Sequence, residues 1–399
     1  MEYYSQKAAE TFPYTPGERP ERSSIKINTN ENPYAPSPEA IAAAREVMGG
    51  GRGSRNAAGA AEVSESGRAD GAAGTDLRLY PDPESDEVRQ AVVEGEREAG
   101  GIRLDPENVF VGNGSDDVLS ICFQAFFPPV GAEGKALLFP DLSYSFYPVY
   151  ANLYGVPYRK VPVNERFEID SRDYMTPNAG ILFPNPNAPT GIYKPVSEME
   201  SLLEYTLHKS LVVVDEAYIA FVGDAGSYHN HGRVSAASLI SRYPNLLVVR
   251  TLSKSHALAG LRVGYALGRP HLIEGLTRIK NSINSYPVGI LAQKIAAAAL
   301  QDTAYYAQTT ARIVATRERV TQRLTRMGFR VLPSSANFVL AAHAKVAAQD
   351  LYQLLGEKGI WVRYFNMPRI DNFIRVSMGT DEEMDIFLER VQRIVEGEA

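Results

Sequence analysis

The sequence predicts an α/β fold built on a large, mostly parallel sheet, followed by a smaller C-terminal α/β domain. After residue 80, short β-branched apolar runs alternate with helical stretches, as in a parallel sheet that is buried on both faces. From about residue 270 the pattern changes to long helices and then to two further strand-like runs. The length of 399 residues is enough for two or three domains.

The N-terminal region has two parts with different compositions. Residues 1–48 contain too many prolines for regular structure over most of their length, so we expect an extended arm that leads into the start of the smaller domain. Residues 49–76 have almost no large apolar side chain and cannot bury enough surface to offset the entropy lost on ordering. We therefore expect a mobile insertion at 49–76.

The rest of the chain divides into a large domain at 77–270 and connecting helices with a smaller domain at 271–399. The runs expected to form strands of the large sheet are 108–111, 136–139, 180–183, 211–214, 246–250 and 262–267. Helices are expected at 197–208, 290–300, 304–327 and 347–358, and further strands at 336–340 and 373–376.

The composition excludes several classes of function. A formal net charge of -6 provides no basic field for nucleic acid, and no apolar run approaches the ~18 residues of a membrane span. The first residues lack the pattern of a secretory signal, so we expect a cytoplasmic protein. Cys122 lies among apolar neighbours and is expected in the core. His229 and His231 have no carboxylate at ligand spacing, which favours a solvated loop over a metal site.

Reactive residues follow the predicted strands, where functional groups gather in an open α/β sheet. A glycine turn, GNGSDD at 112–117, precedes a predicted helix and favours a phosphate. Asp215 ends one apolar run, and Lys254 follows the next, with Ser253 and Arg262 beside it. An amine, a carboxylate and anion ligands are the groups needed to hold pyridoxal phosphate.

These residues lie in phrases that resemble fold-type I pyridoxal-phosphate aminotransferases, and among them most closely the histidinol-phosphate aminotransferases. The matching phrases are INTNENP (27–33), YPD (80–82), GNGSDD (112–117), SYSFY (143–147), NPNAPTG (185–191), DEAYIAF (215–221), TLSKSHALAGLRVGY (251–265), ANFVL (336–340) and IRVSMGT (374–380). The resemblance implies a seven-stranded sheet and transamination between L-histidinol phosphate and 2-oxoglutarate in histidine biosynthesis.

The resemblance also implies a role for each matching residue. The expected catalytic residues are Lys254, which bonds the cofactor and moves the substrate proton, Asp215 at the ring nitrogen and Tyr218 at the ring oxygen. The other expected cofactor ligands are Gly114, Ser115, Asp116, Tyr144, Asn187, Ser253 and Arg262, with Tyr80 reaching over from the second subunit of a homodimer. The expected substrate contacts are Asn32, Asn337, Arg363 and Arg375.

The sequence departs from the family pattern at two positions. Ala188 stands where the family has an asparagine, so the preceding Asn187 is expected to supply the amide. His256 replaces an aromatic or aliphatic residue, and packing is favoured there over proton transfer. Arg262, Arg363 and Arg375 have the alternative of structural ion pairs.

The cofactor residues leave other functions open. An aromatic amino-acid aminotransferase and a decarboxylase of threonine phosphate would both use the same cofactor set. The effector-binding domain of a transcription regulator would need a winged helix and a basic face, and the sequence indicates neither.

Overall fold

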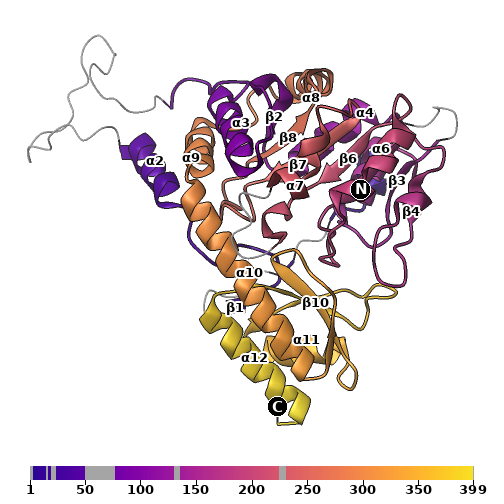
Figure 1. Cartoon of the computed structure of the whole chain (residues 1–399), viewed down its shortest axis with the longest axis vertical. Coiled ribbons are helices and arrows are strands. Elements are labelled where there is room, and N and C mark those ends of the chain that lie inside the picture. Colours follow the sequence, from indigo (N-terminus) through magenta and orange to yellow (C-terminus); the bar gives the residue numbers. More distant parts are fainter. Residues whose placement is uncertain are drawn as a thin grey trace, which may run out of the picture.

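The computed structural model describes residues 3–14, 17–18, 24–49, 77–129, 135–223 and 231–398 (Figure 1). The expected insertion at 49–76 lies outside these ranges apart from Gly49, which ends a helix, so its mobility stays a prediction. The helices are α1 (Gln6–Glu10), α2 (Pro38–Gly49), α3 (Asp86–Gly100), α4 (Ser115–Phe126), α5 (Phe146–Tyr154), α6 (Glu200–Thr206), α7 (His231–Val234), α8 (Pro270–Ile283), α9 (Ile290–Gln301), α10 (Thr303–Arg326), α11 (Ala348–Glu357) and α12 (Asp381–Glu396).

The larger sheet has seven strands in the order β2-β8-β7-β6-β5-β3-β4. Strand β8 is antiparallel to both neighbours, and the other neighbouring pairs are parallel, which confirms the predicted mostly parallel sheet. The strands are β2 (Val109–Gly112), β3 (Leu137–Pro140), β4 (Tyr158–Val161), β5 (Gly180–Pro184), β6 (Val212–Asp215), β7 (Leu246–Thr251) and β8 (Gly264–Gly268). Six of them overlap the predicted runs, and β4 was not predicted.

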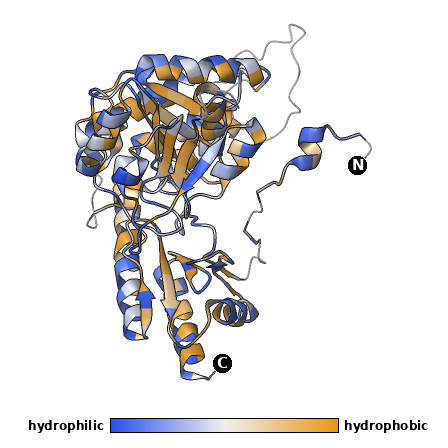
Figure 2. Cartoon of the chain, turned by 90° about the vertical axis from the view of Figure 1, so that its right-hand side faces the viewer, coloured by the Kyte–Doolittle hydropathy of each residue, from blue (hydrophilic) through white to orange (hydrophobic). Residues whose placement is uncertain are grey.

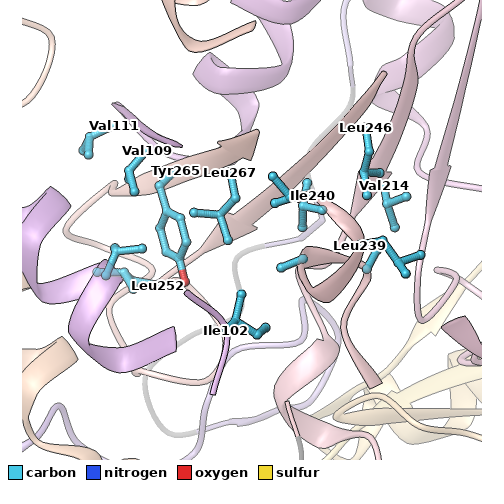
Figure 3. Packing of buried hydrophobic residues seen from close by; sticks show 14 of the residues in the cluster. Ile102, Val109, Val111, Val214, Leu239, Ile240, Leu246, Leu252, Tyr265 and Leu267 are labelled. Atoms are coloured by element: carbon cyan, nitrogen blue, oxygen red, sulfur yellow. The ribbon is translucent and has the colours of Figure 1, made fainter. Parts of the chain in front are cut away.

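Alternate residues of these strands enter different hydrophobic clusters, so the sheet is buried on both faces. Val212 and Val214 of β6 pack with α3, α6 and α9, whereas Val213 packs with α4, α5 and α8. Figure 3 shows the first cluster, in which side chains of β2, β8, β6 and β7 meet Leu239 and Ile240. Cys122 lies in the second cluster as predicted, and burial raises the pKa of its thiol.

The smaller sheet is antiparallel, in the order β12-β13-β10-β9. Its strands are β9 (Phe329–Val331), β10 (Phe338–His343), β12 (Arg363–Tyr364) and β13 (Ile374–Ser377). Helices α10, α11 and α12 contribute apolar residues to its hydrophobic cluster, and Figure 1 shows α10 running from the side of the large sheet to the small one. The predicted C-terminal α/β unit is therefore present.

The N-terminal segment also joins the smaller part of the molecule. Strand β1 (Ile25–Lys26) pairs in parallel with β11 (Ile360–Trp361) near the other end of the chain. Figure 2 shows apolar strands at the centre and helices with polar outer faces around them. Within the described residues, no helix has both the length and the apolar character needed to cross a membrane.

Candidate active site

A cavity of about 340 Å³ opens at the carboxyl ends of β6 and β7, between the large sheet and the smaller one. Both parts of the molecule line it. The predicted site residues in its wall are Tyr144, Tyr218, Lys254, Arg363 and Arg375. The fold thus brings together an amine, two phenols and two guanidinium groups from five separate segments of the sequence.

Lys254 lies in the loop after β7, and its Nζ donates to the carbonyl oxygen of Thr29 at 3.0 Å. Burial, and after it the Arg375 guanidinium, lower the pKa of Lys254, the Glu31 carboxylate acts in the opposite direction, and the resulting pKa is about 8. At pH 7 about one Lys254 in ten is then an uncharged amine, against roughly one in 3000 for an ordinary lysine. Lys254 is therefore suited to act as a nucleophile or a base.

Asp215 ends β6 and is buried, with its carboxylate held by two donors. The phenol of Tyr147 donates to Oδ2 at 2.9 Å, and the backbone N–H of Ala217 donates to Oδ1 at 3.1 Å. Burial raises the pKa of Asp215, these two bonds offset part of the increase, and the resulting pKa is about 6. Asp215 is thus a carboxylate at neutral pH in a largely apolar setting, which suits it to stabilise a cation. Sequence analysis missed Tyr147 as its partner, although SYSFY contains it.

Tyr218 is buried, and its hydroxyl oxygen accepts a hydrogen bond from Asn30 Nδ2 at 2.9 Å. Asn30 adopts the left-handed conformation that asparagine tolerates, with φ at 57°, and its N–H donates to Ser377 Oγ at 2.9 Å. Because the Tyr218 oxygen accepts from Asn30, its own hydrogen remains for donation to another group. Asn30, which sequence analysis did not assign, is the residue that orients Tyr218.

The glycine turn before α4 forms a cradle for an anion. Gly114 has φ at 87°, and a Cβ there would lie 2.5 Å from a guanidinium nitrogen of Arg262, so only glycine allows this approach. The first N–H groups of α4, at Ser115 and Asp116, have no partner within the helix. Arg262 donates to Asp116 Oδ2 at 3.1 Å, which makes it an ion-pair partner as well as an expected phosphate ligand.

Ser253 and Tyr144 border the same cradle. The Ser253 hydroxyl accepts from Thr251 Oγ1 at 2.9 Å, and the Tyr144 hydroxyl donates to Asp116 Oδ1 at 2.8 Å. Strand β8 passes close behind, since a Cβ on Gly264 would lie 2.3 Å from the Ser115 nitrogen. Thr251 is paired with Gly264, so Ser253 and the turn at Gly114 lie on neighbouring segments at the same end of the sheet, and their binding of a phosphate stays a prediction.

Arg363 and Arg375 lie opposite each other on β12 and β13. Arg375 donates to the Asn28 carbonyl at 2.9 Å and packs over the rings of Phe338 and Phe365, at 5.2 and 5.4 Å from their centroids. Its Nε is buried and has no hydrogen-bond partner among the described residues. Burial and the neighbouring Arg363 charge lower the pKa of Arg375. Two close cations with an unused donor form a site for an anionic group.

The three asparagines predicted for the site have hydrogen-bond partners within the chain. Asn187 uses both amide hydrogens, on the Leu142 carbonyl at 2.9 Å and on Thr190 Oγ1 at 3.0 Å, which leaves none for a cofactor oxygen. Asn32 likewise donates to the Lys254 and Ser255 carbonyls, at 3.0 and 3.1 Å, and so supports the lysine loop.

Asn337 is fully buried and donates to the Asn30 carbonyl at 2.9 Å, so it helps to fix the backbone of Asn30. Asn32 and Asn337 thus hold other parts of the site, and the substrate contacts predicted for both stay predictions.

Tyr80 lies away from the cavity of its own chain. Its side chain is 79% exposed and stacks on Tyr286 with 4.6 Å between ring centroids. The single chain therefore lacks the predicted Tyr80 contact, which requires a second copy.

The two histidine predictions have different outcomes. His256 stacks on Tyr306 at 4.6 Å, and burial, with the Arg250 charge, lowers its pKa to about 3, so it remains uncharged and packs as favoured. His231 is buried in α7 next to Tyr306, which contradicts the predicted solvated loop. His229 lies outside the described residues.

The sequence matches the family model "Aminotransferase class I and II" over residues 22–391. Histidinol-phosphate aminotransferase of Acinetobacter baumannii (strain AB307-0294) is 43% identical over 384 residues, which cover 96% of this chain and 94% of the relative. The enzyme of the same name from Pseudomonas putida (strain W619) is 46% identical over 381 residues, covering 95% of this chain and 96% of the relative.

Among solved structures, the fold is similar to histidinol-phosphate aminotransferase from Sinorhizobium meliloti in complex with pyridoxal-5'-phosphate. The TM-score is 0.80 with 22% sequence identity, and the match covers 100% of this chain and 99% of that one. At this identity the likeness concerns the fold.

Proposed function

The chain belongs to aminotransferase class I and II, and on this basis we propose that it transfers the amino group of L-histidinol phosphate to 2-oxoglutarate. The products would be imidazole acetol phosphate and glutamate, in histidine biosynthesis. The relatives that are 43–46% identical over almost the whole chain carry the name of this activity. The observation that carries the proposal is the pair of guanidinium groups facing the cavity that contains Lys254.

The residues fit pyridoxal phosphate as the cofactor. The turn at Gly114 and the start of α4, with Ser253 and Arg262, would hold the phosphate, and the buried Asp215 would hold the ring nitrogen. When bound, pyridoxal phosphate supplies an aldehyde that bonds amines and an electron-withdrawing ring. A Cβ at Gly114 would fill the cradle, and this is the feature of the structure that favours the fit.

Each chemical task has a candidate among the chain's own residues. Lys254, with its lowered pKa, would take the proton from the substrate Cα and return it to the carbon on the other side of the substrate nitrogen. Asp215, ionised above about pH 6, would keep the ring nitrogen protonated. Tyr218, oriented by Asn30, would donate to the ring oxygen.

Substrate choice would depend on Arg363 and Arg375. Histidinol phosphate carries a phosphate monoester and glutamate a carboxylate, so both amine donors bring an anion to the same cavity. Hydrogen bonds to charged groups are worth ~1.5 to 3 kcal/mol each, so Arg375→Ala should lower kcat/KM by ~10- to 200-fold for both substrates. The loss of kcat/KM should be smaller for an amine substrate that carries no such anion. Equal losses for charged and uncharged amines would make Arg375 structural.

The test is a half-reaction assay that compares histidinol phosphate, phenylalanine and threonine phosphate as amine donors. We expect the highest kcat/KM with histidinol phosphate. A preference for phenylalanine would assign the protein to the aromatic aminotransferases, and release of carbon dioxide from threonine phosphate would assign it to the decarboxylases.

The proposal includes a cytoplasmic homodimer that completes the site. Apolar side chains are exposed near Tyr80, on the segment that follows the insertion and at the end of α8; they include Leu77, Leu79, Ile283 and Tyr286. Burial of these side chains against a second copy would bring Tyr80 to the neighbouring cavity. Sedimentation of the purified protein at about twice the mass of one chain is the expected result.

A further inference from the structure

An ammonium group is buried beneath the segment that carries Tyr80. Lys280 of α8 is 2% exposed, and its Nζ donates to the Pro83 carbonyl at 2.6 Å and lies 3.3 Å from Glu84 Oε1. Burying a charge is costly, and a buried ion pair is often no more stabilising than an apolar side chain of the same size. Stability alone therefore gives no reason for a lysine at this position.

A second buried side chain holds the same segment from a different helix. Gln293 of α9 is 6% exposed, and its Nε2 donates to the Asp82 carbonyl at 2.8 Å and to the Val288 carbonyl at 2.9 Å. The carboxylate of Asp82 in turn accepts from the N–H groups of Asp86 and Glu84, at 2.6 and 3.0 Å. The backbone at 82–83 is thus fastened from α8, from α9 and from the start of α3.

The other end of this segment has the opposite character. Tyr80 is 79% exposed, and its ring stacks on the ring of Tyr286. A fixed backbone with an outward-facing aromatic tip is suited to present a side chain to another surface. Pro81 and Pro83 restrict the backbone on either side of Asp82, which further limits the directions that Tyr80 can take.

We propose that Lys280 and Gln293 are positioning residues that hold Tyr80 in place for the cofactor phosphate in the partner subunit. This inference rests on the proposed function, because it requires pyridoxal phosphate and a site shared between two subunits. Neither side chain lines the cavity that contains Lys254 in its own chain. Their effect on cofactor binding is therefore predicted to occur only in the neighbouring site.

The first test measures the Kd of pyridoxal phosphate from the visible absorption of the lysine-bound cofactor in Lys280→Met and Gln293→Leu proteins. Each substitution removes the donor and keeps a side chain of similar size. A misdirected Tyr80 loses one hydrogen bond, so Kd should rise ~3- to 10-fold, with little change in kcat at saturating cofactor. The matched control is Lys294→Met, which breaks the exposed pair of Lys294 with Glu87 and should leave Kd unchanged. An unchanged Kd in both test variants overturns the proposal.

The second test uses hybrid dimers with Lys254→Ala. In this hybrid one subunit carries Lys280→Met and the other carries Lys254→Ala. The only site that keeps a reactive lysine is that of the Lys280→Met subunit, and it receives its Tyr80 segment from the other subunit, in which Lys280 is intact. Its Kd should return to the wild-type value. A Kd that stays raised means that Lys280 acts within its own subunit, and this refutes the proposal.

Hybrids of Tyr80→Ala with Lys254→Ala separate this proposal from the function on which it rests. If the Tyr80→Ala hybrid regains activity but the Kd of the Lys280→Met hybrid stays raised, only the role of Lys280 is refuted. No recovery despite proven subunit exchange refutes the shared site itself, and the positioning role with it.

Discussion

Replacing Tyr147 with phenylalanine removes one hydroxyl from a fully buried side chain and one hydrogen bond from Asp215. The bond is 2.9 Å long, and it joins a phenol to Oδ2 in surroundings without solvent. The ring keeps its place against Phe139 and Tyr144, so the packing of α5 on the sheet is retained. The expected change is therefore electrostatic and concentrated on a single carboxylate.

The size of the effect follows from the contacts of that carboxylate. Burial raises the pKa of Asp215, the Tyr147 bond is the largest of the contributions that lower it, and the resulting pKa is about 6. A hydrogen bond to a charged group is worth ~1.5 to 3 kcal/mol, and ~1.4 kcal/mol corresponds to one pKa unit. Tyr147→Phe should raise the pKa by ~1 to 2 units, so that the ionised fraction at pH 7 falls from about nine-tenths to between a half and a tenth.

The assay is the rate at which the cofactor-free protein captures pyridoxal phosphate, measured by stopped flow between pH 5 and 9. Capture needs ionised Asp215, so the wild-type rate should fall steeply below about pH 6, and in Tyr147→Phe the fall should begin one to two units higher. Tyr174→Phe is the matched control, because its equally buried hydroxyl has no hydrogen-bond partner among the described residues. If the capture rate of a folded Tyr147→Phe protein falls at the same pH as that of the wild type, the proposed role of the Tyr147 bond to Asp215 is refuted.

Three further changes test other parts of the site. Asp215→Asn should make the cofactor-free protein more stable at pH 8 by up to about 3 kcal/mol and leave it nearly unchanged at pH 4. The reason is that folding raises the pKa of the Asp215 carboxyl from 3.8 to about 6, so the protonated carboxyl stabilises the fold at low pH and this stability is lost as pH rises through 6. Urea titrations at pH 4 and pH 8 measure the difference. Arg375→Met should move the pKa of Lys254 from about 8 toward 10.5, because it removes a neighbouring cation, and the alkaline limb of cofactor capture reports it. Gly114→Ala should raise the Kd of pyridoxal phosphate by ~10-fold or more, since φ is +87° and the cradle has no room for a Cβ. Gly101→Ala, with φ at +68° and open space around it, should lower stability without changing Kd.

The large sheet was predictable because its strands are buried on both faces. Such strands are continuous apolar runs, and each run between 108 and 267 overlaps an observed strand. Strand β4 was missed for the same physical reason. It forms the edge of the sheet, and its residues Arg159 and Lys160 are exposed, so the run YRKV carries no apolar signal.

The candidate site was predictable where a residue type is rare in its setting, and not where its role depends on a distant partner. A lysine and an aspartate at the ends of apolar strands are unusual enough to indicate chemistry. The pairing of Tyr147 with Asp215 depends on how α5 packs against the sheet, which local sequence does not specify. Asn187 shows the same limit, because its amide turns to the Leu142 carbonyl, a contact 45 positions away in the chain.

The parallel pairing of β1 with β11 has a consequence for the order in which a new chain becomes active. Ile25 pairs with Ile360, and the Thr29 carbonyl that receives the Lys254 ammonium follows β1 directly. During synthesis the large sheet can form once residue 268 has left the ribosome, yet the segment at 25–30 has no partner strand until more than ninety further residues have followed. Catalytic competence is therefore reached only after β11 has been synthesised, and a chain truncated before β11 would keep Lys254 and Asp215 without the wall that closes their cavity.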